Sequence, residues 1–191
     1  DHEIPDDGRP DLRFPERSPQ GEPLFHPPLD WTERRRLVDE VYAPWYAEVR
    51  ARREGLIRQY GRLAHLDLNT WGLGDLPEDL AGELDKHPKL MIANGGYPDT
   101  GEGERVSATP RATRALALAL RQELGLSVGV NRRFKGGGVV RTFGHHAGNT
   151  LQLTWQRSLV TTPDELHLDP TRLRAFTRAL SRALTAWLGS S

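Results

Sequence analysis

The segment from Val130 to Gly144, VNRRFKGGGVVRTFG, has the residue types of an anion-binding site. Three consecutive glycines follow Lys135 and let the backbone approach a ligand closely. Arg141 lies within the apolar run VVRTF, which we predict to be a strand, and an unpaired cation is costly to bury there. The planar guanidinium binds a carboxylate through two hydrogen bonds, so Lys135 and Arg141 are candidates for holding a substrate carboxylate. The alternative is a flexible hairpin between two strands, whose glycines permit positive φ.

A second stretch with polar groups is HLDLNTWG, from His65 to Gly72. Alternation with two leucines places Asp67 and Asn69 on the same face of a predicted strand, close to its carboxyl end. Asp67 can orient a neighbouring group and Asn69 can hydrogen-bond a ligand. The alternative is a strand-to-loop turn held by local Asn and Thr hydrogen bonds.

The histidines make a weak case for a metal. His145 and His146 are adjacent in a glycine-bounded loop, His65 lies on a predicted strand, and the sequence holds neither HExxH nor CxxC. Adjacent loop histidines are more often exposed than ligating. His65, His145 and His146 are therefore the metal-ligand candidates, without a spacing that selects them.

Composition excludes several classes of protein. The 191 residues carry 26 basic and 26 acidic side chains, which argues against nucleic acid or an anionic membrane as the partner. The arginine clusters ERRR (33–36) and RARR (50–53) support a nucleic-acid binder only weakly, because such runs usually form a solvated helix face. No apolar run approaches the roughly 18 residues of a membrane span. The absence of cysteine excludes disulfides and thiolate chemistry.

Hydrophobic periodicity and capping signals predict the elements that position these groups. Asp30 with Glu33 forms a capping box before a long helix that ends at Gly61, with an apolar stripe and with Pro44 as a point of kinking or splitting. Thr109-Pro110 and Asp169-Pro170 open two more helices, the first ending at Gly125. The predicted strands are 63–68, 90–93, 128–131, 138–143 and 150–155.

The interspersed strands and helices indicate an α/β layered domain with a mixed sheet. The last three strands, joined by short links, suggest an antiparallel portion. We expect residues 1–191 to form one domain, with the proline-rich segment 1–29 lying extended on it through scattered apolar residues. Met91 is the single methionine, so we also expect sequence upstream of Asp1.

Together these stretches resemble the N-formylglutamate amidohydrolase family. NRRFKGGGVVRTFG resembles the family signature N-x-x-F-K-G-G-x-x-x-R-x-x-G, and GNTLQLTW is similar to its H-A-x-Q-L-E-x strand. HLDLNT is similar to the D-x-H-S strand end, EVYAPWYAEV to a helix with a Y-x-P-Y/W pattern, and DHEIPDD to a D-L-N-R-x-x-D-D region.

The resemblance implies a phosphorylase/hydrolase-like (zinc-peptidase-like) fold, a zinc-activated water that attacks an amide, and basic residues that receive the substrate carboxylates. We also expect a cytoplasmic protein. The catalytic positions it indicates are Asp67, Asn69 and Arg141. The substrate-binding positions are Asn131, Lys135, Gly136, Gly137 and Arg141.

Three departures affect the metal side of such a site. Asn69 replaces the family histidine, Thr154 replaces the acid/base glutamate, and the motif with the other metal ligands would precede Asp1. An amide is a poor zinc ligand beside an imidazole. Two functions follow as hypotheses: hydrolysis of an N-formyl or N-acyl amino acid with zinc, or a catalytically degenerate member that binds a small anion or a protein.

Overall fold

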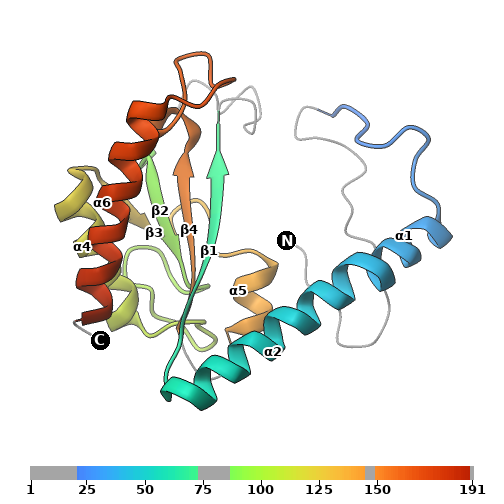
Figure 1. The fold of residues 1–191 in the computed structure, drawn as a ribbon, viewed down its shortest axis with the longest axis horizontal. Coiled ribbons are helices and arrows are strands. Elements are labelled where there is room, and N and C mark those ends of the chain that lie inside the picture. The colour runs from blue at the N-terminus through green and yellow to red at the C-terminus, as the bar shows by residue number, and fades with distance from the viewer. Residues whose placement is uncertain (1–20, 73–86, 145–148, 190–191) are drawn as a thin grey trace.

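The computed structural model describes residues 21–72, 87–144 and 149–189, which form an α/β domain around a four-stranded mixed sheet (Figure 1). The strands lie in the order β1-β4-β2-β3. Their bounds are β1 Ala64–Trp71, β2 Leu90–Ala93, β3 Val128–Val130 and β4 Asn149–Gln156. The helices are α1 Trp31–Leu37, the π-helical turn η1 Val38–Tyr42, α2 Ala43–Tyr60, α4 Pro110–Leu124, α5 Gly138–Phe143, the 3-10 turn η4 Arg157–Leu159 and α6 Pro170–Gly189.

The sheet pairs strands that are distant in the chain. β1 is parallel to β4, β2 is parallel to β3, and β2 is antiparallel to β4. The antiparallel portion predicted among consecutive strands near the C-terminus is therefore wrong. Since β2 and β3 are parallel, the chain between them must cross back over the sheet, and α4 makes this crossover.

The strand predicted over residues 138–143 is also wrong, because this segment is the short helix α5. Gly136 turns the chain with φ of 113°, and the Arg141 N–H then donates to the Gly137 carbonyl. In a helix, Val140 and Phe143 share one buried face, which alternation along a strand would not allow. Tertiary packing thus outweighs the strand preference of the β-branched residues.

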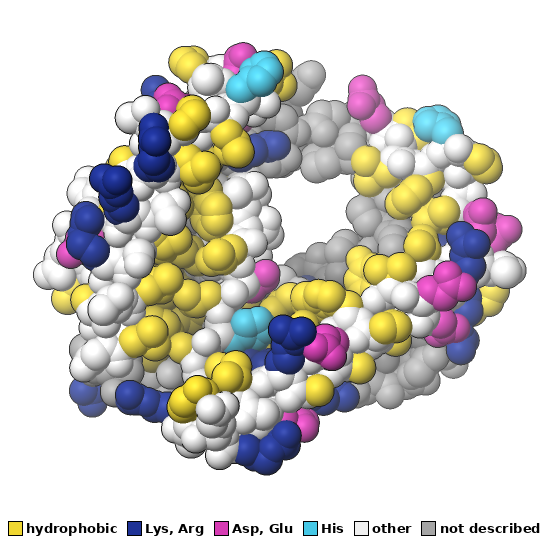
Figure 2. Space-filling model, in the orientation of Figure 1, with side chains coloured by type: hydrophobic (Ala, Val, Ile, Leu, Met, Phe, Trp, Pro, Cys, Tyr) yellow, Lys and Arg dark blue, Asp and Glu magenta, His cyan; other side chains and the backbone are white. Residues whose placement is uncertain are grey.

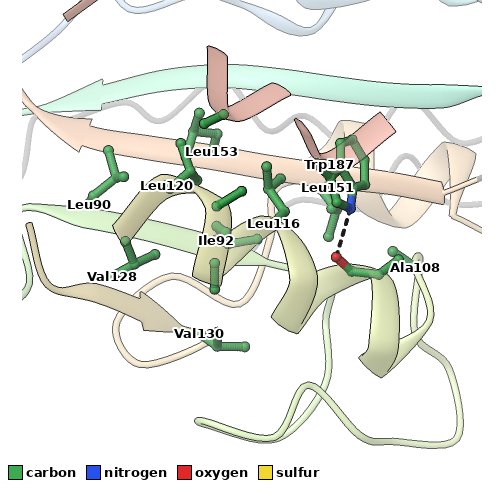
Figure 3. Close-up of a cluster of buried hydrophobic side chains, with 14 of the residues drawn as sticks. Leu90, Ile92, Ala108, Leu116, Leu120, Val128, Val130, Leu151, Leu153 and Trp187 are labelled. Atoms are coloured by element: carbon green, nitrogen blue, oxygen red, sulfur yellow. Dashed lines mark hydrogen bonds between the residues drawn. The ribbon is translucent and has the colours of Figure 1, made fainter. Parts of the chain in front are cut away.

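The core lies between one face of the sheet and helices α4 and α6. Leucines and an isoleucine of β2 and β4 meet Leu116 and Leu120 of α4, and all of these side chains are fully buried (Figure 3). Trp187 of α6 closes the cluster and donates from Nε1 to the Ala112 carbonyl at 3.0 Å. The buried indole therefore has its hydrogen-bond partner, as such groups require.

Both core helices begin where the sequence predicts, and α4 also ends at the predicted glycine. The Thr109 hydroxyl accepts from the Ala112 N–H, and Gly125 ends α4 with φ of 64°. Asp169 Oδ1 accepts from the Thr171 and Arg172 N–H groups at the start of α6. These side chains satisfy amide groups that have no partner within the helix.

The predicted long N-terminal helix is present as α1, η1 and α2 in succession, extending away from the sheet (Figure 1). Asp30 and Glu33 form the predicted capping box. Pro44 lacks an N–H, and the π-helical turn directly before it accommodates this defect, with the Ala43 N–H donating to the Val38 carbonyl. Across these three described elements Arg53 is the one buried side chain, so the apolar stripe does not enter the core.

Residues 1–20 of the segment that we predict to lie on the domain are outside the described residues, and Leu24 in its remainder is 48% exposed. Within the part of the chain that the structure describes, no helix combines the length and apolar character that a membrane crossing requires.

Replacing a core leucine tests this packing. We expect Leu116→Ala to lower the free energy of unfolding by about 2–5 kcal/mol, because it removes a fully buried side chain and leaves a cavity. Leu118→Ala on the same helix is the matched control, since Leu118 is 53% exposed and its loss should change stability by about 0.5 kcal/mol at most. Urea unfolding measures both, and equal effects would contradict this core.

Candidate functional site on the polar face of the sheet

The sheet face opposite the core carries polar side chains from the parallel pair β1 and β4. The register places His65 opposite Thr150, Asp67 opposite Gln152 and Asn69 opposite Thr154. Of the alternate residues, Leu66, Leu151 and Leu153 point into the core, so the polar face follows from the alternation itself. Asn69 is exposed, and its Oδ1 accepts from the Thr70 N–H at 2.9 Å.

Phe143 of α5 connects this face to helix α2. The fully buried Phe143 ring stacks on Tyr46 with ring centroids 5.6 Å apart and contacts the His65 ring at 5.7 Å. The Arg53 guanidinium lies 5.2 Å from the same ring, and its Nη2 donates to the Phe143 carbonyl. Burial and the charge of Arg53 lower the pKa of His65, so its neutral form is favoured.

The pKa of Tyr46 responds to groups from both α5 and β1. Burial is the main cause that raises the pKa of Tyr46, and the nearby carboxylate of Asp67 raises it further, whereas Thr142 and Arg141 lower it. Burial likewise raises the pKa of Asp67. Asp67, Arg141 and Thr142 therefore all lie close enough to Tyr46 to influence it, which places α5 and β1 in one site.

The glycine segment is held against the sheet by one hydrogen bond. The Gly137 N–H donates to Gln152 Oε1 at 2.8 Å, and Gln152 is the register partner of Asp67. A Cβ on Gly136 would come within 2.7 Å of Val140 Cγ1, so glycine is required there for the turn as well as for the approach. Lys135, directly before the turn, is exposed.

The structure does not bring Asn131 to this face. Asn131 is fully buried, and its Nδ2 donates to Asn94 Oδ1 at 2.7 Å and to the Tyr97 carbonyl at 3.2 Å. Its Oδ1 accepts from the Asn94 N–H. Its side-chain hydrogen bonds thus hold the loop after β2 in place. The resemblance implies that Asn131 binds substrate, whereas these bonds show that it positions this loop.

Two buried polar atoms without partners lie further along the same strands. Trp71 and Gln156 are register neighbours, 2% and 8% exposed. Among the described residues, neither Trp71 Nε1 nor Gln156 Oε1 has a hydrogen-bond partner. Trp71 Nε1 is a donor and Gln156 Oε1 is an acceptor, so the two atoms could bind the carbonyl and the N–H of an amide group. Phe134 packs on Trp71, and Arg133 lies over both rings.

The described residues do not provide a zinc site. Residues 21–72, 87–144 and 149–189 contain no group of three or more His, Asp or Glu side chains that could hold a metal. His65 and Asp67 supply two donors on this face, whereas catalytic zinc takes three from the protein. His145 and His146 lie outside the described residues.

Sequence reasoning missed Tyr46, Arg53 and Gln152. Tyr46 lies on the apolar stripe of the predicted N-terminal helix, and helical spacing groups residues on a face without showing what that face contacts. Gln152 carried a usable signal, because a polar residue alternating with leucines on a buried strand must find a partner.

Comparison with known proteins identifies relatives of the chain. A family model described as N-formylglutamate amidohydrolase matches residues 8–161. The crystal structure of N-formylglutamate amidohydrolase from Ralstonia eutropha has the same fold, with a TM-score of 0.65 at 18% sequence identity. The alignment covers 87% of this chain and 57% of that one, so this chain spans little more than half of that relative. No curated protein matches the chain.

The raised pKa of Asp67 makes a prediction about stability. The folded state binds the Asp67 proton more tightly than the unfolded chain, so the charged carboxylate opposes folding above its ordinary pKa and ceases to do so below it. We expect Asp67→Asn to raise the free energy of unfolding at about pH 7 and to leave it unchanged at about pH 3. Urea unfolding at both pH values measures this. Asp39→Asn, which removes an exposed carboxylate paired with Arg35, should bring no gain at either pH.

Proposed function

The chain belongs to the N-formylglutamate amidohydrolase family, and we propose that it binds a ligand of this family's kind without hydrolysing it. The proposed ligand is a small N-acyl amino acid that carries a carboxylate. The proposed binding surface is the polar face of β1 and β4 together with α5. The chain is then a catalytically degenerate member of the family that retains ligand recognition.

One observation carries this proposal: Asn69 and Thr154 are register partners. The resemblance implies a histidine ligand at the first position and an acid/base glutamate at the second. Both replacements therefore fall at one point of the sheet, where a neutral amide and a neutral hydroxyl now lie side by side. Such a pair can hydrogen-bond a ligand, but it offers zinc no good donor and water no base.

The groups that recognise a ligand support the binding half of the proposal. The charge of Arg141 lowers the pKa of Tyr46, whose ring stacks on Phe143 of the same short helix, and the Arg141 guanidinium suits a carboxylate. The amide of an N-acyl amino acid offers the acceptor and the donor that Trp71 Nε1 and Gln156 Oε1 lack. Lys135 supplies a second, exposed cation beside the glycine turn.

Hydrolysis of the same ligand is the competing function, and Asp67 is the observation that favours it. A half-buried carboxyl with a raised pKa can accept a proton from an attacking water and return it to a leaving amine. His65 on the same strand face would be the nearest imidazole. The two functions differ in whether an acyl group is released.

Binding of N-formyl-L-glutamate, measured by isothermal titration calorimetry, tests the recognition. We expect binding to the wild-type protein, a loss of roughly tenfold or more in Arg141→Ala, and a smaller loss in Arg141→Lys, which keeps the charge but not the planar fork. Arg58→Ala, an exposed ion-pair position on α2, should bind as the wild type does. An affinity that does not depend on Arg141 would contradict the proposed site.

Zinc separates binding from catalysis. We expect the wild-type protein to release no formate from N-formyl-L-glutamate with zinc present and to bind no stoichiometric zinc by elemental analysis. The double variant Asn69→His/Thr154→Glu adds an imidazole and a carboxylate beside Asp67, so it should gain zinc binding. Formate release by the wild-type protein would instead establish the hydrolase.

A further inference from the structure

Helices α4 and α6 hold a concentrated positive charge within a chain of zero net charge. Their sequences contain seven arginines and one acidic residue, Glu123. The two helices pack against each other on the outer side of the sheet, where Lys and Arg side chains follow the surface of the molecule (Figure 2). Three of the seven arginines pair with an acidic residue: Arg114 with Glu102, Arg172 with Asp169 and Arg182 with Glu123. The other four have no ion pair among the described residues, so this face keeps a local positive field that the net charge conceals.

The N-terminal helix shows what a neutralised arginine-rich surface looks like in this protein. Along α1, η1 and α2, four arginines pair with an acidic residue one turn away. Arg35 with Asp39 and Arg52 with Glu48 are the closest of these pairs. This spacing is the usual arrangement of a solvated helix face. The arginines of α4 and α6 have no such pattern within their helices.

The arginines run in rows along the outer face. Arg111, Arg114 and Arg121 recur at helical spacing on α4, with Leu118 between them, and Arg174 and Arg178 are one turn apart on α6. Among the described residues, Arg111 and Arg178 make no hydrogen bond or ion pair. Leu118 is 53% exposed, which adds an apolar contact to a cationic surface.

The arginines of α4 and α6 extend along most of the length of α4. The helices run antiparallel, because Trp187 near the end of α6 bonds Ala112 near the start of α4, while Arg182 pairs with Glu123 near the end of α4. Arg178 therefore lies toward the far end of α4 from Arg111. A partner helix of about 14 residues would match the 15-residue length of α4.

We propose that the outer face of α4 and α6 is a docking surface for an acidic amphipathic segment of a partner protein. Its carboxylates would pair with arginines including Arg111 and Arg178, and one apolar side chain would rest on Leu118. The exposed leucine selects this partner, since a phosphate backbone offers nothing apolar to contact it. Charge complementarity at such a surface also speeds association.

The test uses a fluorescein-labelled helical peptide of about 14 residues, with glutamates along one face and leucines beside them. Fluorescence anisotropy with the full chain should show binding that weakens as salt is added. The double variant Arg111→Glu/Arg178→Glu should lose roughly tenfold or more in affinity, and Leu118→Ala should lose less. Circular dichroism checks folding, and Arg111→Gln/Arg178→Gln replaces the reversal if it fails to fold.

The matched control is Arg35→Glu/Arg36→Glu on α1, which changes the net charge by the same amount at a site already paired with acidic residues. It should bind the peptide as the wild type does. Equal losses in the two reversals would overturn the proposal, because net charge alone would then govern binding. Tighter binding of a DNA duplex or of phosphatidylserine vesicles through Arg111 and Arg178 would overturn the choice of partner.

Discussion

The pairing of β1 with β4 is the constraint on which the other features depend. Eight residues of each strand pair in parallel. The alternation sends Leu66, Leu151 and Leu153 to the core and polar groups to the opposite face. A slip of β1 by one residue would place Asp67 in the core and leave Leu66 on the polar face. The register therefore builds the core and the candidate site in one step.

The polar face is closed by a short helix. α5 contributes Phe143 as a fully buried ring between the sheet and α2. Thr142 of the same helix hydrogen-bonds Tyr46, and the charge of Arg141 lowers the pKa of Tyr46. Six residues are too few for a stable isolated helix, so packing and the Gly137 bond to Gln152 must hold it. The position of Arg141 consequently depends on the sheet beneath this helix.

The two faces of the domain place their cationic side chains in different surroundings. On the sheet's polar face, cations lie beside titratable groups that burial has shifted, as expected where a small ligand is recognised. On the outer face of α4 and α6, the arginines are exposed and sit beside a single exposed leucine on α4. A small site and an extended surface can thus coexist in a chain without net charge.

The sequence by itself determined the helix caps, β2, the fold class and the membership of Asp67 and Asn69 in one strand face, because these depend on local hydrogen bonds and alternation. It also pointed to the family through motifs. Tertiary structure alone decided that residues 138–143 form a helix, that Asn131 turns into a loop network, and that Asn69 meets Thr154 across 85 positions of sequence. Strand order and register arise from long-range packing, which local preferences do not specify.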